Sequence, residues 1–206
     1  MTHPRTDVAD RLLDIAYQMT AATGPAALSV RAVQREAGVS AATAYWHFKD
    51  RTDLLLAVGR RATADLANAL DDAIRNPHQG IASDLAAVCL AYMHFAQNQP
   101  GLFRAVAWSS SIEELLRPSA AARGRSGLAA FEILQHAVRD ALGDGAGAPS
   151  VDDVSIHVWA ACHGLAVLLM DSPLAELPEA EQERLRRQHV SVVLRSIVGA
   201  QPPPRE

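Results

Sequence analysis

Residues Leu28 to Arg51 read LSVRAVQREAGVSAATAYWHFKDR, and this stretch decides the fold. It holds two short helical patterns joined by Ala37-Gly38-Val39-Ser40. Gly38 suits the positive φ of a tight helix exit. Ser29 and Ser40 precede the two patterns, and serine is a preferred N-cap residue. The spacing therefore predicts a helix-turn-helix whose two helices are about nine and eight residues long.

Helical patterns flank this motif on both sides. Upstream, apolar residues recur at i, i+4 and i+7 from near Asp7 and stop at Gly24-Pro25. Downstream, Asp50 followed by Asp53 predicts another N-cap. The apolar stripe then continues to Asn76-Pro77. At about 1.5 Å per residue this fourth helix is nearly 40 Å long, so we expect it to connect two domains.

The remainder of the chain predicts longer and more apolar helices. Aromatic residues make up 5% of the 206 residues, alanine and leucine are abundant, and no strand of alternating pattern is present. The expected helices cover 81–98, 100–116, 119–142, 150–170 and 179–198. We therefore predict an all-α fold of about nine helices. Its N-terminal three-helix domain should cover 6–66, a larger helical domain 67–199, and a disordered tail 200–206.

The formal charge of −4 is unevenly distributed. Residues 1–62 hold eight Lys and Arg against six acids, a net charge of +2, and the remainder holds eleven against seventeen, a net charge of −6. A basic excess beside the motif suits binding to DNA phosphates, which displaces counterions and makes affinity depend on salt. A net charge of +2 also arises from the ordinary variation of charge along a chain. The charge therefore agrees with DNA binding but does not establish it without the motif.

The second helix of the motif has the layout of a DNA-reading helix. Such a helix places residues near its N-terminus against base edges, while flanking donors hold phosphates. Arg31 and Thr43 are the best candidates for base contact, and the small Ala41 and Ala42 allow close approach. The candidate DNA-binding residues are Ser29, Arg31, Ser40, Ala42, Thr43, Tyr45, Trp46, His47, Lys49 and Arg51.

The aromatic residues of this helix have a structural alternative, because they could form the core of a three-helix bundle. We favour that alternative for Phe48. Tyr45, Trp46 and His47 are adjacent and span about 200° of a helix, so a helix this short cannot bury all three. We expect these three residues, with the basic residues that follow, to hold phosphates and set the register on DNA.

From Arg11 through Leu56 the sequence resembles the N-terminal domain of the TetR family of bacterial transcriptional regulators. The resemblance rests on the apolar run LLDIAYQMTAATG, on LSVRAVQREAGVS, on the aromatic-His-Phe signature YWHF, and on a basic residue followed by Leu54-Leu55. Ala44 stands where the family usually has Leu, and Arg51 where Lys is common. The resemblance implies a DNA-binding transcriptional regulator, with repression as the family's common mode.

The second domain carries a group of aromatic, Met and polar side chains. Trp159, His163 and Met170 share one face of a predicted helix. VWAACHGLAVLL and Gly101–Arg104 are similar to the Trp, His-Gly (WHG) type of TetR ligand domain. Apolar pockets between helices bind small ligands, so we expect an apolar or aromatic effector of drug size here. Taken singly, each residue fits the core equally well. The candidate ligand-binding residues are Tyr92, Met93, Phe103, Arg104, Trp108, Trp159, His163 and Met170.

The last two predicted helices have apolar faces that one subunit cannot fully cover. The resemblance implies that they form a four-helix homodimer interface. A two-fold dimer reads two half-sites about 34 Å apart on double-stranded operator DNA. Effector binding is then expected to move the long fourth helix and lower DNA affinity, a coupling of typically about 1–3 kcal/mol.

Two cysteines, Cys89 and Cys162, lie in apolar runs and are interpreted as reduced core residues, as in a cytosol. The N-terminus lacks the apolar core of a signal peptide. The longest apolar run, 160–170, contains His163 and is too short to span a bilayer. We therefore expect a cytoplasmic protein that does not enter a membrane.

Two other functions compete with this interpretation. A helical small-molecule-binding or metal-dependent enzyme is one, but the sequence has no HExxH, no ligand spacing among His157, Cys162 and His163, and no nucleophile-elbow serine. We therefore predict no catalytic residue, no metal ligand and no cofactor. The other rival is a helical adaptor that binds only protein, which leaves the exposed aromatic residues beside Lys49 unexplained.

Overall fold

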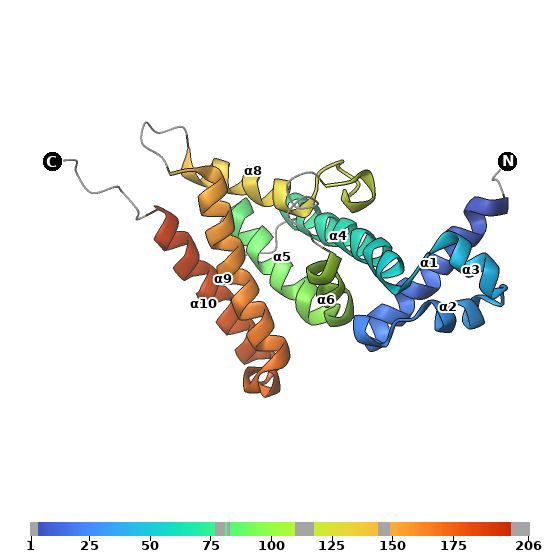
Figure 1. Ribbon diagram of the computed structural model, residues 1–206. Coiled ribbons are helices and arrows are strands. Elements are labelled where there is room, and N and C mark those ends of the chain that lie inside the picture. The colour runs from blue at the N-terminus through green and yellow to red at the C-terminus, as the bar shows by residue number, and fades with distance from the viewer. Residues whose placement is uncertain (1–3, 77–80, 82, 110–117, 144–148, 199–206) are drawn as a thin grey trace. The chain divides into compact units, whose positions relative to one another are not determined.

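The computed structural model describes residues 4–76, 81, 83–109, 118–143 and 149–198. Every regular element in these ranges is helical, and nine of the elements are α-helices (Figure 1). This confirms the predicted all-α fold class. The chain forms two compact units. The first comprises Met1–Ala64 and Gln99–Arg123, and the second comprises Asp65–Asn98 and Gly124–Glu206.

The first unit is built on the helix-turn-helix. In it α1 packs against α2, and α2 packs against α3 (Figure 1). The N-terminal part of α4 and the later helix α6 belong to the same unit, and α6 packs against α1. The elements are α1 (Pro4–Thr23), η1 (Pro25–Ala27), α2 (Val30–Ala37), α3 (Ala41–His47), α4 (Arg51–Arg75), α6 (Pro100–Ser109) and η2 (Ala120–Ala122).

Serine side chains cap the start of both helices of the motif, and a glycine follows the first of them, as predicted. Ser29 Oγ accepts the N–H of Ala32 at 3.1 Å, and Ser40 Oγ accepts the N–H of Thr43 at 3.0 Å. Gly38 follows α2 with a φ of 64°. A non-glycine residue is strained in that conformation, so Gly38 fixes the direction in which the chain enters α3.

Apolar side chains from three helices form the core beneath the motif. Leu12 of α1, Val33 of α2 and Leu54 of α4 are almost completely buried. Ala44 is the buried residue of α3, with 1% of its surface exposed. This small side chain lets the short helix lie close to its neighbours, and the other positions of α3 remain outside the core.

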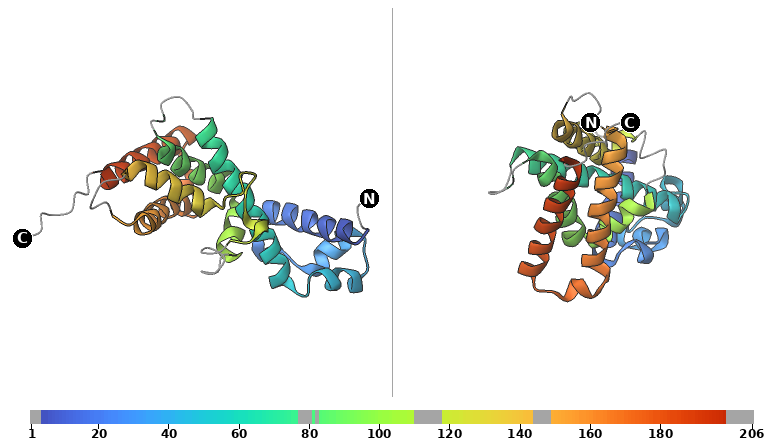
Figure 2. Two further views of the ribbon diagram at one scale, coloured as in Figure 1. Left: turned by 90° about the horizontal axis from the view of Figure 1, so that it is seen from above. Right: turned by 90° about the vertical axis from the view of Figure 1, so that its left-hand side faces the viewer.

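The second unit contains the longer apolar helices. Helix α5 packs against α8, α9 and α10, and α9 and α10 lie side by side (Figure 2). Buried residues such as Leu85, Val138 and Val158 form its core. Its elements are the C-terminal part of α4, α5 (Asp84–Asn98), α8 (Ala130–Leu142), α9 (Val151–Asp171), η3 (Pro173–Glu176) and α10 (Glu179–Val198).

Two predicted helix boundaries were wrong. Helix α1 begins at Pro4 rather than near Asp7, because proline suits the first turn, where its missing N–H is not needed. The expected helix 119–142 is a short 3₁₀ turn followed by a turn, and α8 begins only at Ala130. Gly127 adopts a φ of 79°, which ends helical geometry there. The predicted helical residues 110–116 and the tail 200–206 lie outside the described residues.

Helix α9 is longer and more apolar as a whole than its central run suggested. By length and composition alone its 21 residues could cross a membrane, and 28% of the apolar window is buried. Asp152 and Asp153 stand in its first turn and Asp171 at its end. The core of the unit therefore buries only part of the apolar window of α9.

Candidate nucleic-acid interface and effector region

Helix α3 presents its aromatic residues to the outside. Tyr45 is 42% exposed and Trp46 is 62% exposed. The preceding residue, Ala44, is buried. The rings of Trp46 and His47 meet edge to face with centroids 4.6 Å apart. Large exposed aromatic residues on one short helix are available for a partner, because the core does not use them.

The N-terminal end of α3 is small and polar. Ala41 and Ala42 are exposed, and the hydroxyls of Ser40 and Thr43 lie 2.7 Å apart in a mutual hydrogen bond. The side chain of Gln34 donates to the carbonyl of Val39 at 2.5 Å and holds the turn between the two helices. The candidate base-contacting hydroxyl of Thr43 thus sits at an open helix end of fixed geometry.

Charged residues flank this surface. Arg31 is exposed on the first turn of α2, and Lys49 is exposed between α3 and α4. The N–H of Lys49 donates to Asp53 Oδ2 at 3.1 Å, and the N–H of Asp53 donates to Asp50 Oδ1 at 2.8 Å. These bonds confirm the predicted N-cap of α4 and fix the backbone that carries Lys49.

Arg51 has an internal role that sequence reasoning did not anticipate. Its Nε donates to the carbonyl of Leu28 at 3.0 Å, and its Nη2 donates to the carbonyl of Pro25 at 2.7 Å. These bonds tie the first turn of α4 to the segment that precedes α2. Arg51 therefore holds the motif together with two of its three nitrogens.

We expect Arg51→Lys to destabilise the protein by about 1–2 kcal/mol, although the charge is kept. A lysine ammonium cannot reproduce the planar fork that reaches two carbonyls at once. Urea unfolding measures the effect, with the exposed Arg35→Lys as the matched control. Equal stability of the two variants would show that the carbonyl contacts contribute nothing.

The candidate effector residues fall into both units. Phe103, Arg104 and Trp108 lie on α6 in the first unit, where Phe103 is buried and Arg104 is half-buried. The side chain of Trp108 lies outside the described part of the structure. The remaining candidates belong to the second unit, where Met93 is buried and Met170 is half-buried; they are Tyr92, Met93, Trp159, His163 and Met170.

Three of these residues form a hydrogen-bonded network between α5 and α9. Trp159 Nε1 donates to Tyr92 Oη at 3.0 Å, and Tyr92 Oη lies 2.8 Å from His163 Nδ1. The ring of Phe131 on α8 packs edge-on against Trp159 with centroids 6.1 Å apart. The fold therefore brings the polar atoms of Tyr92, Trp159 and His163 together among aromatic rings. The spacing of Trp159 and His163 indicated that these two side chains share one face of a helix.

Burial sets the protonation of this network. It lowers the pKa of His163, which favours the neutral ring. Burial also raises the pKa of Tyr92, while the hydrogen bond from Trp159 opposes that rise. A neutral His163 shares one hydrogen bond with the Tyr92 hydroxyl at Nδ1. The network thus places a neutral imidazole beside the Tyr92 hydroxyl and the Trp159 ring.

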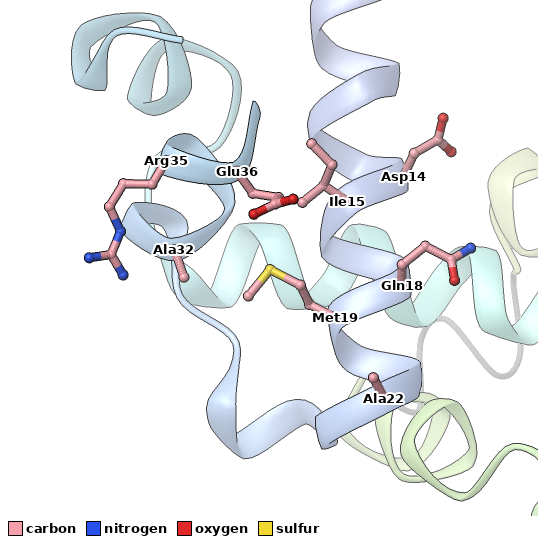
Figure 3. Close-up of a pocket in the computed structure, with 8 residues that line it drawn as sticks. All are labelled: Asp14, Ile15, Gln18, Met19, Ala22, Ala32, Arg35 and Glu36. Atoms are coloured by element: carbon pink, nitrogen blue, oxygen red, sulfur yellow. The ribbon is translucent and has the colours of Figure 1, made fainter. Parts of the chain in front are cut away.

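A groove of about 750 Å³ lies between α1 and α2 in the first unit (Figure 3). It is lined by Asp14, Ile15, Gln18, Met19, Ala22, Ala32, Arg35 and Glu36. Asp14 is also the ion-pair partner of Arg61. Figure 3 shows Ile15 and Met19 of α1 reaching toward α2. With two carboxylates beside apolar residues, this surface does not suit a phosphate backbone, and it contains none of the predicted ligand residues.

A buried charge cluster in the second unit was missed entirely. Arg186 on α10 has no exposed surface, and its Nε donates to Glu183 Oε2 at 2.9 Å. His94 Nε2 on α5 lies 2.9 Å from the same carboxylate oxygen. Arg186 also donates to Gln97 and to Glu179. Helical periodicity did not reveal it, because charged residues at these positions normally face solvent.

Comparison with known proteins agrees with this architecture. Residues 12–58 match the family described as bacterial regulatory proteins, tetR family. Residues 85–193 match the tetracyclin repressor-like C-terminal domain. No curated protein matches the chain.

Solved structures share the fold over almost the whole chain. A protein of unknown function from Rhodococcus sp. RHA1 is 24% identical with a TM-score of 0.69, covering 92% of this chain and 95% of that one. The regulator FadR of Bacillus subtilis, in complex with stearoyl-CoA, is 14% identical with a TM-score of 0.59, covering 90% and 97%.

The two family matches cover both the helix-turn-helix and most of the second unit. The chain therefore belongs to the TetR family of bacterial regulatory proteins, and it is a DNA-binding transcriptional regulator.

Proposed function

We propose that the protein is a repressor that a small apolar or aromatic effector releases from its operator. The proposal that the protein binds an operator rests on the exposed surface of α3. Tyr45 and Trp46 are exposed on this helix, whereas Ala44 is buried. Thr43 and Arg31 are proposed to contact bases. The other candidates are proposed to hold phosphates or the backbone of the motif; they are Ser29, Ser40, Ala42, Tyr45, Trp46, His47, Lys49 and Arg51.

The operator is first identified by sequencing the DNA that the purified protein retains. On that DNA, Arg31→Ala is expected to weaken binding about tenfold to a hundredfold, because a base contact is worth about 1–3 kcal/mol. Trp46→Ala should weaken it less, and on all sequences alike. The control is Arg139→Ala, an exposed arginine of α8. Unchanged affinity of both variants would place the DNA contacts outside Arg31 and Trp46.

The effector is proposed to bind in the second unit beside the Tyr92, Trp159 and His163 network. The aromatic side chains around this network favour a largely apolar molecule. FadR, which shares the fold, was solved with stearoyl-CoA, and EbrR was solved as a multidrug binding protein. Titration with long-chain acyl compounds and aromatic cations, followed by Trp fluorescence, tests this. The absence of any response in an active DNA binder would count against it.

A homodimer is proposed to form through α9 and α10. Ile156, Val167 and Leu168 of α9 and Val192 of α10 are 36–52% exposed, although all four are large and apolar. A Cβ placed on Gly164 of α9 would meet nothing within 4 Å, so packing inside the subunit does not require a glycine there. A second copy is the occupant that a two-fold operator requires. Asp152 and Asp153 on the exposed side disfavour lipid.

We expect Leu168→Glu to shift the protein from dimer to monomer at micromolar concentration. The side chain is 49% exposed within the subunit, so the subunit itself should remain folded. A carboxylate buried in an apolar interface is strongly unfavourable. Sedimentation velocity measures the change, with His136→Glu on the exposed face of α8 as the control. A dimer of undiminished affinity would place the interface elsewhere.

The domain roles follow from these assignments. Residues 6–66 are proposed as the DNA-binding domain and 67–199 as the ligand-binding and dimerisation domain of a cytoplasmic protein without enzymatic activity. Within the described residues, no group of three His, Cys, Asp or Glu side chains is arranged to hold a metal ion. Metal analysis of the purified protein tests the metal-dependent alternative directly.

A further inference from the structure

The groove between α1 and α2 takes no part in the proposed DNA interface or effector region. Its volume of about 750 Å³ lies within the range of small-molecule sites, which is roughly 300–1,000 Å³. Helix α1 contributes positions 14, 15, 18, 19 and 22, and α2 contributes positions 32, 35 and 36. Residues at these spacings share one face of a helix. Two helices that pack directly on each other therefore form the walls of the groove.

The inner part of the groove is apolar. Ile15 and Met19 of α1 and Ala32 of α2 are half-buried, so the core covers only part of their surface. Figure 3 shows the Met19 side chain reaching toward α2. A methionine side chain is flexible and polarisable, and it adapts to aromatic partners. These residues offer an apolar surface that can adjust to the body of a ligand.

One carboxylate faces this apolar surface. Figure 3 shows the Glu36 side chain directed toward α1, whereas the Arg35 guanidinium is directed away from α1. Glu36 is exposed and forms no ion pair or side-chain hydrogen bond with the described residues. The other carboxylate of the groove, Asp14, is paired with Arg61. That guanidinium lies 4.4 Å from the ring centroid of Tyr17, which does not line the groove. The groove therefore presents one available negative charge beside its apolar residues.

We propose that this groove binds an organic cation that carries an apolar or aromatic body. The body packs against Ile15, Met19 and Ala32, and the cationic group lies beside the carboxylate of Glu36. An organic anion of the same shape is repelled by that carboxylate. A metal ion is a poor occupant, because no group of three His, Cys, Asp or Glu side chains in the described ranges is arranged to hold one.

This site is separate from the effector region. It lies in the first unit, whereas Tyr92, Trp159 and His163 lie in the second. Helix α2 also carries Arg31, the residue directly before Ala32 of the groove. A cation held in the groove therefore contacts the helix that is proposed to read bases. This consequence rests on the proposed function, but the binding site itself does not.

The test follows the full-length protein by NMR with isotope-labelled methionine methyl groups. The sequence has four methionines, which are Met1, Met19, Met93 and Met170. Met19 reports on the groove, and Met93 and Met170 report on the second unit. The probe is tetraphenylphosphonium, and its matched control is tetraphenylborate, an anion of the same shape. We expect the cation to shift the Met19 signal to saturation at concentrations at which the borate leaves it unchanged.

One substitution tests the role of the carboxylate. Glu36→Gln keeps the size of the side chain and should weaken the cation's affinity about threefold to fivefold, as expected for an exposed charge pair. The control is Asp10→Asn, an exposed acid of α1 outside the groove, which should change nothing. An unmoved Met19 signal, equal shifts from the borate, or unchanged affinity in Glu36→Gln would overturn the proposal. Shifts confined to Met93 and Met170 would also overturn it, while supporting the effector region in the second unit.

Discussion

Gly101→Ala is expected to destabilise the first unit by about 3 kcal/mol and to weaken operator binding. Gly101 lies in the first turn of α6, where the backbone meets the C-terminal end of α1. A Cβ at this position would lie 2.1 Å from the carbonyl oxygen of Thr20 and 3.0 Å from that of Ala21. Both atoms belong to backbone, so no side-chain rotation relieves the clash, and α6 must separate from α1.

Hydrogen exchange measured by mass spectrometry localises this effect. Amides at the end of α1 and throughout α6 should exchange faster in the variant, because the contact between them protects both. Gln99→Ala is the matched control, since Gln99 is exposed and stands only two residues earlier. If Gly101→Ala and the control exchange alike, the close approach of α6 to α1 contributes nothing to stability.

The Gly101 contact also has a functional consequence. Helix α5 ends at Asn98 and α6 begins at Pro100, so only Gln99 separates a helix of the second unit from a helix of the first. Because α6 packs on α1, a variant that frees α6 should lose effector response before it loses DNA binding. Titration of operator release by an identified effector checks this order.

Local signals explain why the helix-turn-helix could be predicted from the sequence. Ser29 and Ser40 cap helices through bonds within three residues, and Gly38 supplies its own backbone conformation. These interactions require no distant partner. The exposure of Tyr45 and Trp46 also followed from geometry, since adjacent residues on a short helix cannot all be buried.

Features that depend on distant contacts could not be predicted in the same way. The bonds of Arg51 to Leu28 and Pro25 become visible only after the chain has folded back, so the sequence indicated a phosphate contact alone. The turn before α8 was missed because an alanine-rich segment has high helix propensity, which Gly127 overrides. The network of Tyr92, Trp159 and His163 was partly predictable, because two members share one helix face.

Arg186→Ala is expected to have the second large effect, a loss of about 3–5 kcal/mol from the second unit. The guanidinium is fully buried, and it bonds to Glu183 and Glu179 of its own helix and to Gln97 of α5. Its removal leaves a cavity and deprives Glu183 of a charged partner. Urea unfolding should show a lower midpoint, whereas Arg195→Ala, exposed on the same helix, should change little.

The double variant Arg186→Met with Glu183→Leu separates the charge from the packing. Replacing a buried ion pair by apolar residues of similar volume is often neutral, because neither charge remains to be desolvated. The double variant should therefore be more stable than Arg186→Ala. Equal losses would show that the hydrogen bond from Arg186 to Gln97, rather than the ion pair, holds α10 to α5.

The same cluster determines how stability depends on pH. Burial alone would raise the pKa of Glu183, but hydrogen bonds from His94 and Arg186 outweigh it and lower the pKa to about 2. The unfolded carboxyl titrates near 4.5, so the stabilisation is complete above that pH and is lost as the pH falls toward 2. In Arg186→Ala this acid-induced loss should be smaller, since one of the bonds that lower the pKa is gone. A denaturation series from pH 7 to pH 2 measures the difference, and parallel curves for the two proteins would contradict the assignment of that bond.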